Sequence, residues 1–115
     1  MAVVRNVSKQ TVVADAAVAK ASWTRMIGLM GRASLPAGEG LIFPGAQGVH
    51  THFMRFPIDL LFYDKAQRVH AISPGVKPWR FSRYHLRAKG VIELPAGALA
   101  TSHTEPGDQL SIEGL

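Results

Sequence analysis

Short apolar runs separated by turn residues follow one another along most of the chain. The valine- and alanine-rich segments Val3–Val7 and Thr11–Val18 favour β-strands, and the first is expected at a sheet edge. Turn residues such as Pro44-Gly45 and Pro106-Gly107 separate the later runs. The further predicted strands are Leu41–Phe43, Val49–Phe56, Ile58–Tyr63, Arg68–Ile72, Val91–Leu94 and Gln109–Glu113.

One segment has helical spacing instead. Its apolar side chains recur at i, i+3, i+4 and i+7, so they share one face of a helix. Ser22 can cap the start, and Gly31 can supply the left-handed residue that ends the helix. The side chains on this face are Trp23, Met26, Ile27 and Met30.

Seven or eight short strands with one helix predict a mainly β fold, either a small β-sandwich or a partly open barrel. A parallel α/β sheet is not expected, because the sequence offers no crossover helix between strands. The predicted core consists of Trp23, Ile27, Leu41, Phe43, Ile58, Leu60, Phe62, Ile72, Ile92, Leu94, Leu110 and Ile112.

Length and composition limit the class of protein. The 115 residues fit one domain, residues 1–115, and there is no cysteine for a disulfide or a thiolate metal site. The first residues lack the apolar core of a signal peptide, and no apolar run approaches the roughly 18 residues of a membrane span. We therefore expect a soluble, cytoplasmic protein. Its net charge of +5 favours anionic partners.

His50 and His52 are the first candidates for chemistry. On a strand they would project from the same face, which is half of a metal site. A third ligand would have to come from Asp59, Asp64 or His70. The alternative is one buried, hydrogen-bonded histidine and one exposed histidine, and we favour that alternative because two histidines form no recognised metal motif.

Arg55 and Asp59 form a second candidate pair, with Pro57 between them. Proline cannot donate a ladder hydrogen bond, so the strand is expected to bend there and to aim its charged residues into a cleft. Arg55 could bind a carboxylate or phosphate, and Asp59 could orient the ligand or act as a base. Alternatively, the two residues form an ion pair that holds the bend, and this is the interpretation we favour.

Trp79, Arg80 and the basic run to Lys89 form a third candidate. A flat ring beside guanidinium groups can stack on a base or a sugar and neutralise phosphate. A nucleic acid partner is disfavoured, because the tract is short and has no recognised motif. A solvated loop with Trp79 folded back onto the core is the simpler interpretation.

Glu39 and Glu93 are further carboxylates. Glu93 alternates with Ile92 and Leu94, which predicts that it points to the opposite face of its strand. A carboxylate pair across a cleft would suggest glycoside chemistry, but nothing in the sequence brings Glu39 and Glu93 together.

Several stretches together resemble one family. RMIGLMGR, LPAGEGLIF, HTHFMRFPIDLLFYD, KPWR, VIELPAG and PGDQL, in this order from about Arg25 to Leu110, are similar to domain-of-unknown-function family 192. The resemblance implies a compact, β-rich domain of bacteria and archaea, mostly standalone, some members with secretion signals, and without an established activity. Many members have Trp-Met-Lys-Asn where this chain has Phe53-Met-Arg-Phe56, so any chemistry of that asparagine is missing here.

These observations favour a small binding module for an anionic or sugar-like ligand, with no cofactor, no resident metal and no membrane partner. A hydrolytic or metal-assisted enzyme using His50, His52 and Asp59 is the first alternative. A protein-interaction module without a small ligand is the second. The ligand-binding residues that we predict are His50, Thr51, Arg55, Asp59, Trp79 and Arg80.

Overall fold

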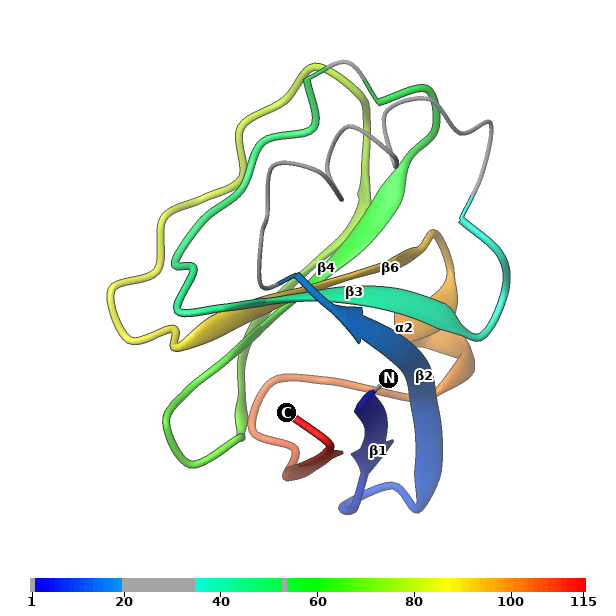
Figure 1. The fold of residues 1–115 in the computed structure, drawn as a ribbon, viewed down its shortest axis with the longest axis vertical. Helices are drawn as coiled ribbons and strands as arrows, with labels where there is room; N and C mark the ends of the chain where they lie inside the picture. The colour runs from blue at the N-terminus through cyan, green and yellow to red at the C-terminus, as the bar shows by residue number, and fades with distance from the viewer. Residues whose placement is uncertain (1, 20–34, 53) are drawn as a thin grey trace.

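The computed structural model describes residues 2–19, 35–52 and 54–115, and within these ranges seven strands form one curled sheet (Figure 1). The order of the strands across the sheet is β5-β4-β6-β3-β2-β1-β7. The elements are β1 (Ala2–Asn6), β2 (Thr11–Val18), β3 (Glu39–Pro44), β4 (Ile58–Tyr63), β5 (Val69–Val76), β6 (Gly90–Pro95), the short helix α2 (Ala98–Thr101) and β7 (Leu110–Glu113).

Neighbouring strands in this sheet are antiparallel, except for β2 and β3, which pair in parallel. β1 lies between β2 and β7, so the expectation that it forms a sheet edge is wrong. Its residues alternate in burial, with Ala2, Val4 and Asn6 buried on one face.

The two ends of the sheet meet at one corner. Arg68, just before β5, forms an isolated bridge with Gln109, just before β7. Val69 N donates to Asp108 O over 2.8 Å, and Leu110 N donates to Gln67 O over 2.8 Å. Because this seam joins β5 and β7 only near these residues, the fold is a partly open barrel, the second of the two architectures that the sequence predicts.

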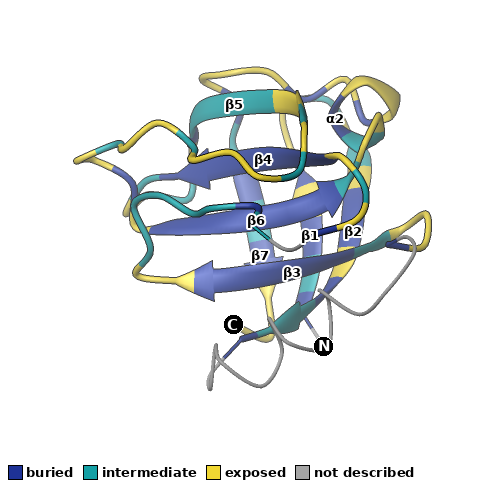
Figure 2. Cartoon of the chain, turned by 90° about the horizontal axis from the view of Figure 1, so that it is seen from above, coloured by how far each residue is buried: buried dark blue, intermediate teal, exposed yellow. Residues whose placement is uncertain are grey.

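Side chains pack on both faces of the central strands, and all six residues of β4 are buried. Leu61 and its neighbours on β3 and β6 belong to a cluster on one face, whereas Leu60 belongs to a cluster on the other face. Segments 45–52 and 77–89 run outside this second face (Figure 2). The predicted core is confirmed for its members on these strands and on β7. Ile72 is only partly buried, and Trp23 and Ile27 lie outside the described residues.

Three other predictions need comment. The helix predicted from Ser22 to Gly31 lies outside the described residues, whereas α2 was not predicted. The strand predicted at Val49–Phe56 is wrong: apart from Phe53, which is not described, the segment is irregular, with one isolated bridge at His50. β5 continues to Val76, past the predicted stop at Ser73-Pro74-Gly75, because a register shift in its pairing with β4 accommodates these residues.

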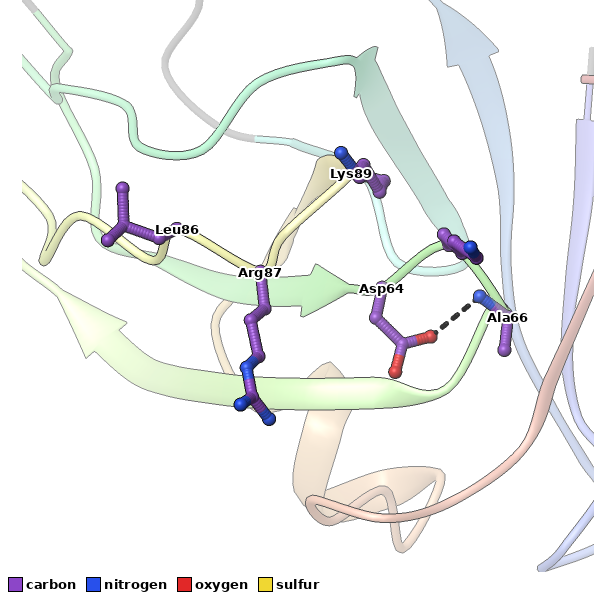
Figure 3. Close-up of a pocket in the computed structure, with 6 residues that line it drawn as sticks. Asp64, Ala66, Leu86, Arg87 and Lys89 are labelled. Atoms are coloured by element: carbon purple, nitrogen blue, oxygen red, sulfur yellow. Dashed lines mark hydrogen bonds between the residues drawn. The ribbon is translucent and has the colours of Figure 1, made fainter.

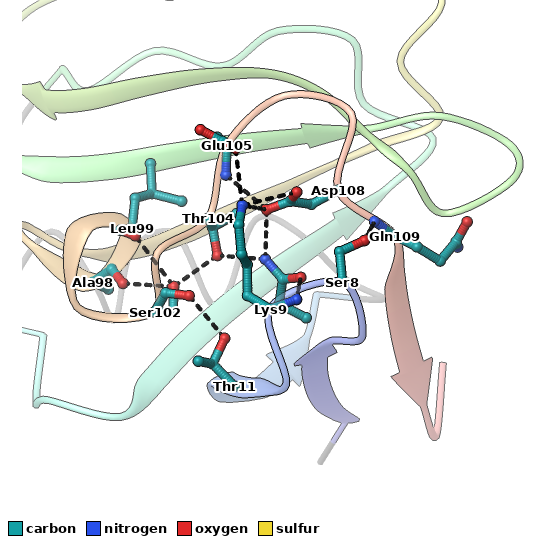
Figure 4. A network of polar contacts seen from close by, with 11 residues as sticks. Ser8, Lys9, Thr11, Ala98, Leu99, Ser102, Thr104, Glu105, Asp108 and Gln109 are labelled. Carbon is teal, nitrogen blue, oxygen red and sulfur yellow. Dashed lines mark hydrogen bonds and ion pairs between the residues drawn. The ribbon is translucent and has the colours of Figure 1, made fainter.

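A buried polar network joins the turn after β1 to the segment before β7 (Figure 4). Asn6 Nδ2 donates to Asp108 Oδ2 over 2.9 Å and to Thr104 Oγ1 over 3.1 Å. Lys9 Nζ forms an ion pair with the same Asp108 oxygen at 2.9 Å. Burial by itself raises the pKa of Asp108, but hydrogen bonds from Asn6, Lys9 and the Glu105 amide outweigh it and leave the pKa below its ordinary value.

Candidate functional site

Two loop segments, 47–52 and 77–82, are joined outside the second face of the sheet. His50 forms an isolated antiparallel bridge with Phe81, and Thr51 N donates to Arg80 O over 2.8 Å. Trp79 N donates in turn to Thr51 O over 3.0 Å. Figure 1 shows the two segments side by side along the left of the view. The loops therefore present their side chains from a fixed backbone.

Thr51, one of the predicted binding residues, is used in this junction. Its side chain is buried, and Oγ1 donates to Lys77 O over 2.7 Å while accepting from Arg80 N over 2.9 Å. A hydroxyl with both functions occupied positions the loop and has little left for a ligand. Thr51 is thus a positioning residue for its neighbours.

Four rings gather on the outer side of this junction, and we call His50, His52, Trp79 and Phe81 the ring ledge. The His52 ring lies 4.7 Å from the Phe81 ring and 5.4 Å from the Trp79 ring, between centroids. The His50 and His52 rings are 5.1 Å apart. Phe81 is 78% exposed and Trp79 is 53% exposed. The ledge is thus an open aromatic surface, and Trp79 is not folded back onto the core.

The backbone at Trp79 is unusual. Its φ of 64° is in the left-handed region, which bulky side chains rarely adopt. Such strain costs free energy, and it persists where the surroundings impose it, often at binding sites. Here hydrogen bonds from Trp79 N to Thr51 O and from Arg80 N to Thr51 Oγ1 hold the backbone at this residue.

The rings of the two histidines lie close together although their segment is not a strand. Both residues are partly buried, and His50 Nδ1 has no hydrogen-bond partner that the structure describes, so the favoured expectation of one buried, hydrogen-bonded histidine and one exposed histidine is wrong. The candidate third ligands lie elsewhere. In the described part of the chain, no group of three or more His, Asp or Glu side chains could hold a metal ion. His70 contacts the ring of His85 instead, at 5.4 Å between centroids. His50 Nδ1 is buried and has no hydrogen-bond partner. Among the described residues, the histidine pair is therefore part of an aromatic surface that contains one buried polar atom, His50 Nδ1.

Asp59, another predicted binding residue, is buried on β4 and serves the fold. Oδ1 accepts from Gly75 N over 2.9 Å, and Oδ2 accepts from Gly97 N over 3.1 Å and from Leu99 N over 3.0 Å. Three amide donors satisfy a carboxylate well, so this group is not available as a base or as a ligand for metal. Its partners fix the end of β5 and the start of α2 to the centre of the sheet.

Arg55 and Arg80 are both exposed. In residues 2–19, 35–52 and 54–115, the ion pairs are those of Lys9 with Glu105 and Asp108, so the ion pair predicted between Arg55 and Asp59 is not formed. Arg80 Nη1 donates to Trp79 O over 3.4 Å and to Pro78 O over 3.3 Å. These contacts keep the Arg80 guanidinium next to the Trp79 backbone, with its other N–H groups available for an anion.

Glu93 points to the opposite face from Ile92 and Leu94, as predicted, and it lies between Leu41 of β3 and Leu60 of β4. The residue is 4% exposed, and Oε2 has no hydrogen-bond partner. Burial raises its pKa to about 8, so the carboxyl is mostly protonated at neutral pH. The alternation of residue types along the strand predicts the direction in which Glu93 points, whereas its burial depends on the residues of segments 45–52 and 77–89 that pack over this face of the sheet.

A hollow lies at the far end of the loop that carries Trp79 (Figure 3). Its volume is about 390 Å³, and it is lined by the turn after β4 and by the residues before β6. Asp64 Oδ1 accepts from Ala66 N over 2.9 Å and from Arg68 N over 3.0 Å, so this carboxylate stabilises the turn. The loop contributes Leu86, Arg87 and Lys89.

Comparison with known proteins identifies the class of this domain. A family model described as "Uncharacterized ACR", DUF192, matches residues 3–112, and the chain therefore belongs to domain-of-unknown-function family 192. Two curated relatives are UPF0127 proteins. One, from Thermococcus sibiricus, is 34% identical over 56% of this chain and 42% of its own length. The other, PF1050 of Pyrococcus furiosus, is 37% identical over 54% of this chain and 53% of its own length. The matches thus span about half of these relatives.

Two solved structures share the fold. A protein of unknown function from Novosphingobium aromaticivorans has a TM-score of 0.79 at 25% identity, and the alignment covers 96% of this chain and 82% of that chain. A chain from Sinorhizobium meliloti, described as a candidate transcription regulator, has a TM-score of 0.73 at 23% identity, with 99% and 93% covered. The second likeness shows the fold alone. No helix among the described residues is long and apolar enough to cross a membrane.

Proposed function

We propose that this domain binds a small anionic ligand that carries a flat or sugar-like ring, and that it does so at the ring ledge. The observation that carries the proposal is the open pair of rings, Trp79 and Phe81, fixed around His52 with the Arg80 guanidinium next to them. Rings exposed in this way can stack on a flat or sugar ring of a ligand, and a guanidinium can bind its phosphate or carboxylate.

Each group has a distinct role in this proposal. Trp79 and Phe81 supply the stacking surface, and Arg80 supplies positive charge next to it. Arg55, an exposed residue without an ion pair among the described residues, stays a predicted second cation. His50 packs its ring against His52 and Phe81 and so supports the stacking surface, while its buried Nδ1 does not face the ligand. Thr51 holds the two loops in register, and Asp59 supports the sheet beneath them without contacting the ligand. The single domain over residues 1–115 and its cytoplasmic location stay predictions.

The test is thermal unfolding of the protein with a panel of nucleoside monophosphates, sugar phosphates, dicarboxylates and divalent metal chlorides. Binding to the folded state raises the Tm by mass action. At a ligand concentration 100 times Kd, the free energy of unfolding increases by about 2.7 kcal/mol. We expect a shift with one ring-bearing anion. Arg80→Gln and Phe81→Ala should abolish this shift, and Arg68→Gln, which removes an exposed guanidinium at the seam, should keep it.

Two results would contradict the proposal. A shift with a metal alone would favour the histidine pair as a metal site, and with it the metal-assisted enzyme. A protein that shifts with no member of the panel would favour the protein-interaction module.

A further inference from the structure

We propose that the natural ligand of the ring ledge is a single-stranded nucleic acid, whose chain follows the basic loop, residues Lys77–Lys89, away from the ledge. This inference rests on the proposed function, because a nucleotide is a ring-bearing, sugar-containing anion. It adds a second part to the site: the ledge holds one unit, and the rest of the loop holds the units that follow.

The charge of the loop is the first argument. From Lys65 to Ile92 the sequence contains no Asp or Glu. A run of cations on one loop without acids favours a polyanion over a single anionic group, since each phosphate neutralised releases counterions. The cations of the basic loop, all on exposed residues, are Lys77, Arg80, Arg83, Arg87 and Lys89.

The exposed apolar side chains are the second argument. Beyond Trp79 and Phe81 of the ledge, Tyr84 is 66% exposed and Leu86 is 76% exposed. Soluble domains seldom expose so many large side chains in one segment without a partner. Flat rings that alternate with cations along an extended backbone are the arrangement on which successive bases stack in single-strand binding proteins.

The path of the loop is the third argument. Ser82 N donates to Val49 O and His85 N donates to Gln47 O, both over 2.9 Å. Gln47 Nε2 donates to Leu86 O over 2.8 Å, and its Oε1 accepts from the Tyr84 hydroxyl. Figures 1 and 2 show the loop extended beside segment 45–52 over much of its length. Fixed spacing lowers the entropy that the protein loses when a strand binds.

These facts favour a nucleic acid ligand more strongly than the sequence alone does. Without a recognised motif, the sequence disfavours a nucleic acid, and Trp79 was expected to fold back onto the core. The exposed rings and the hydrogen-bonded backbone of the loop come from the structure. One carboxylate lies near the end of the loop, because Asp64 lines the same hollow as Arg87 and Lys89. An acidic protein segment would also meet the charge of the loop, but it would leave the ring ledge without flat groups to stack.

The experiment measures fluorescence anisotropy of labelled oligouridylates of about four, eight and twelve units, with UMP as competitor. We expect affinity to rise at least tenfold from the shortest to the longest strand. The logarithm of the binding constant should fall linearly with the logarithm of the salt concentration, with a slope of about −0.7 for each phosphate neutralised. A duplex of the same length should bind more weakly, since its bases are not free to stack.

The variants separate the loop from the ledge. Arg83→Gln with Arg87→Gln should make the salt slope less steep by about 1.4 and leave UMP binding unchanged. Arg5→Gln with Arg68→Gln removes the same charge from exposed positions outside the loop and should change the slope much less. Tyr84→Ala should weaken the longest strand alone, whereas Val12→Ala, at a 55% exposed position on β2, should not.

The outcomes distinguish the two proposals. If UMP binds and length adds nothing, the inference is overturned and the proposed function stands. If neither UMP nor any strand binds but another ring-bearing anion of the panel raises the Tm, the inference is overturned and the proposed function stands. If no member of the panel raises the Tm either, both fail. If a duplex or polyglutamate competes as well as the single strand, the loop is a general polyanion surface or an acidic-protein surface, which also overturns the inference.

Discussion

Leu99 of α2 donates its backbone N–H to Oδ2 of Asp59 on β4, over 3.0 Å and across 40 positions of the chain. The same carboxylate accepts from Gly75 at the end of β5 and from Gly97 before the helix. One buried side chain therefore strengthens the junction of β4 with the end of β5 and joins both to α2, which lies outside the sheet ladder. α2 has four residues and no side-chain cap of its own, so its position depends on Asp59.

Replacing Asp59 by asparagine should destabilise the domain. The asparagine NH₂ group cannot accept the amide protons that one carboxylate oxygen accepts now, which leaves buried donors unpaired and costs about 2–4 kcal/mol. The measurement is urea unfolding. Asp15→Asn, at an exposed position of β2, is the matched control and should stay within about 0.5 kcal/mol of the parent. Equal stability of both variants would mean that Asp59 has a role other than the structural one.

Glu93 should make stability depend on pH in an uncommon direction. Burial raises its pKa from an ordinary 4.5 to about 8, so the folded state binds a proton that the unfolded state releases between these values. The free energy of unfolding then falls as pH rises through this range, by at most about 1.4 kcal/mol per pH unit. Glu93→Gln should remove this fall.

The check is a pH series of urea unfolding curves for the parent, Glu93→Gln and the control Glu113→Gln, whose carboxylate is exposed. We expect Glu93→Gln to gain stability over the parent at pH 8 and to differ much less at pH 5. A difference between the two proteins that is constant with pH would contradict the buried, protonated carboxyl.

The network around Asp108 should act in the opposite direction. Its pKa is held below the ordinary value by the net effect of Asn6, Lys9 and the Glu105 amide, so its contribution to stability is present above about pH 4 and is lost as the pH falls through the lower, folded-state pKa. Asp108→Asn should cost about 2 kcal/mol at pH 7 and less in acid. A double-mutant cycle with Asn6→Ala measures the coupling, and additive effects would show that the two side chains act separately.

Gly90 at the start of β6 leaves room for a ring. It pairs with Tyr63 across the sheet, and a Cβ at Gly90 would overlap the Tyr63 ring, which is buried and cannot easily move. Gly90→Ala should therefore cost about 1–3 kcal/mol through overpacking. Gly48→Ala, where a Cβ would meet atoms at an ordinary 3.4 Å, is the control. If Tyr63→Ala does not reduce the cost of Gly90→Ala, the ring is not the cause.

The strands that the sequence predicts best are those whose own run of apolar residues indicates a strand. Ile58–Tyr63 is a continuous apolar run, and it forms β4, buried on both faces, with the predicted bounds. Thr11–Val18 likewise has the bounds of β2. The predicted strand at Val49–Phe56 fails because its alternating pattern comes from rings on a loop surface and not from one buried face.

Some residues of the candidate site could be predicted from the sequence, and others could not. His50, His52, Trp79 and Arg80 could be picked from residue type and spacing, and the structure brings them together. Asp59 and Thr51 look functional in the sequence, but their polar groups are satisfied by backbone atoms that are distant along the chain. Phe81 could not be predicted, because no residue pattern marks it. Trp79 has a left-handed φ of 64°, and the Phe81 ring reaches the others through the bridge between Phe81 and His50.

The partly closed seam affects how the protein can aggregate, because it leaves part of one strand edge unpaired. Beyond Val69, the outer edge of β5 has no strand beside it in the described sheet, and an unpaired edge can recruit a strand from another copy. Pro74 lacks an N–H to offer, and Gly75 has a φ of 63° that an extended neighbour cannot follow. The two residues that look like a loop signal in the sequence thus act as a guard against edge-to-edge aggregation.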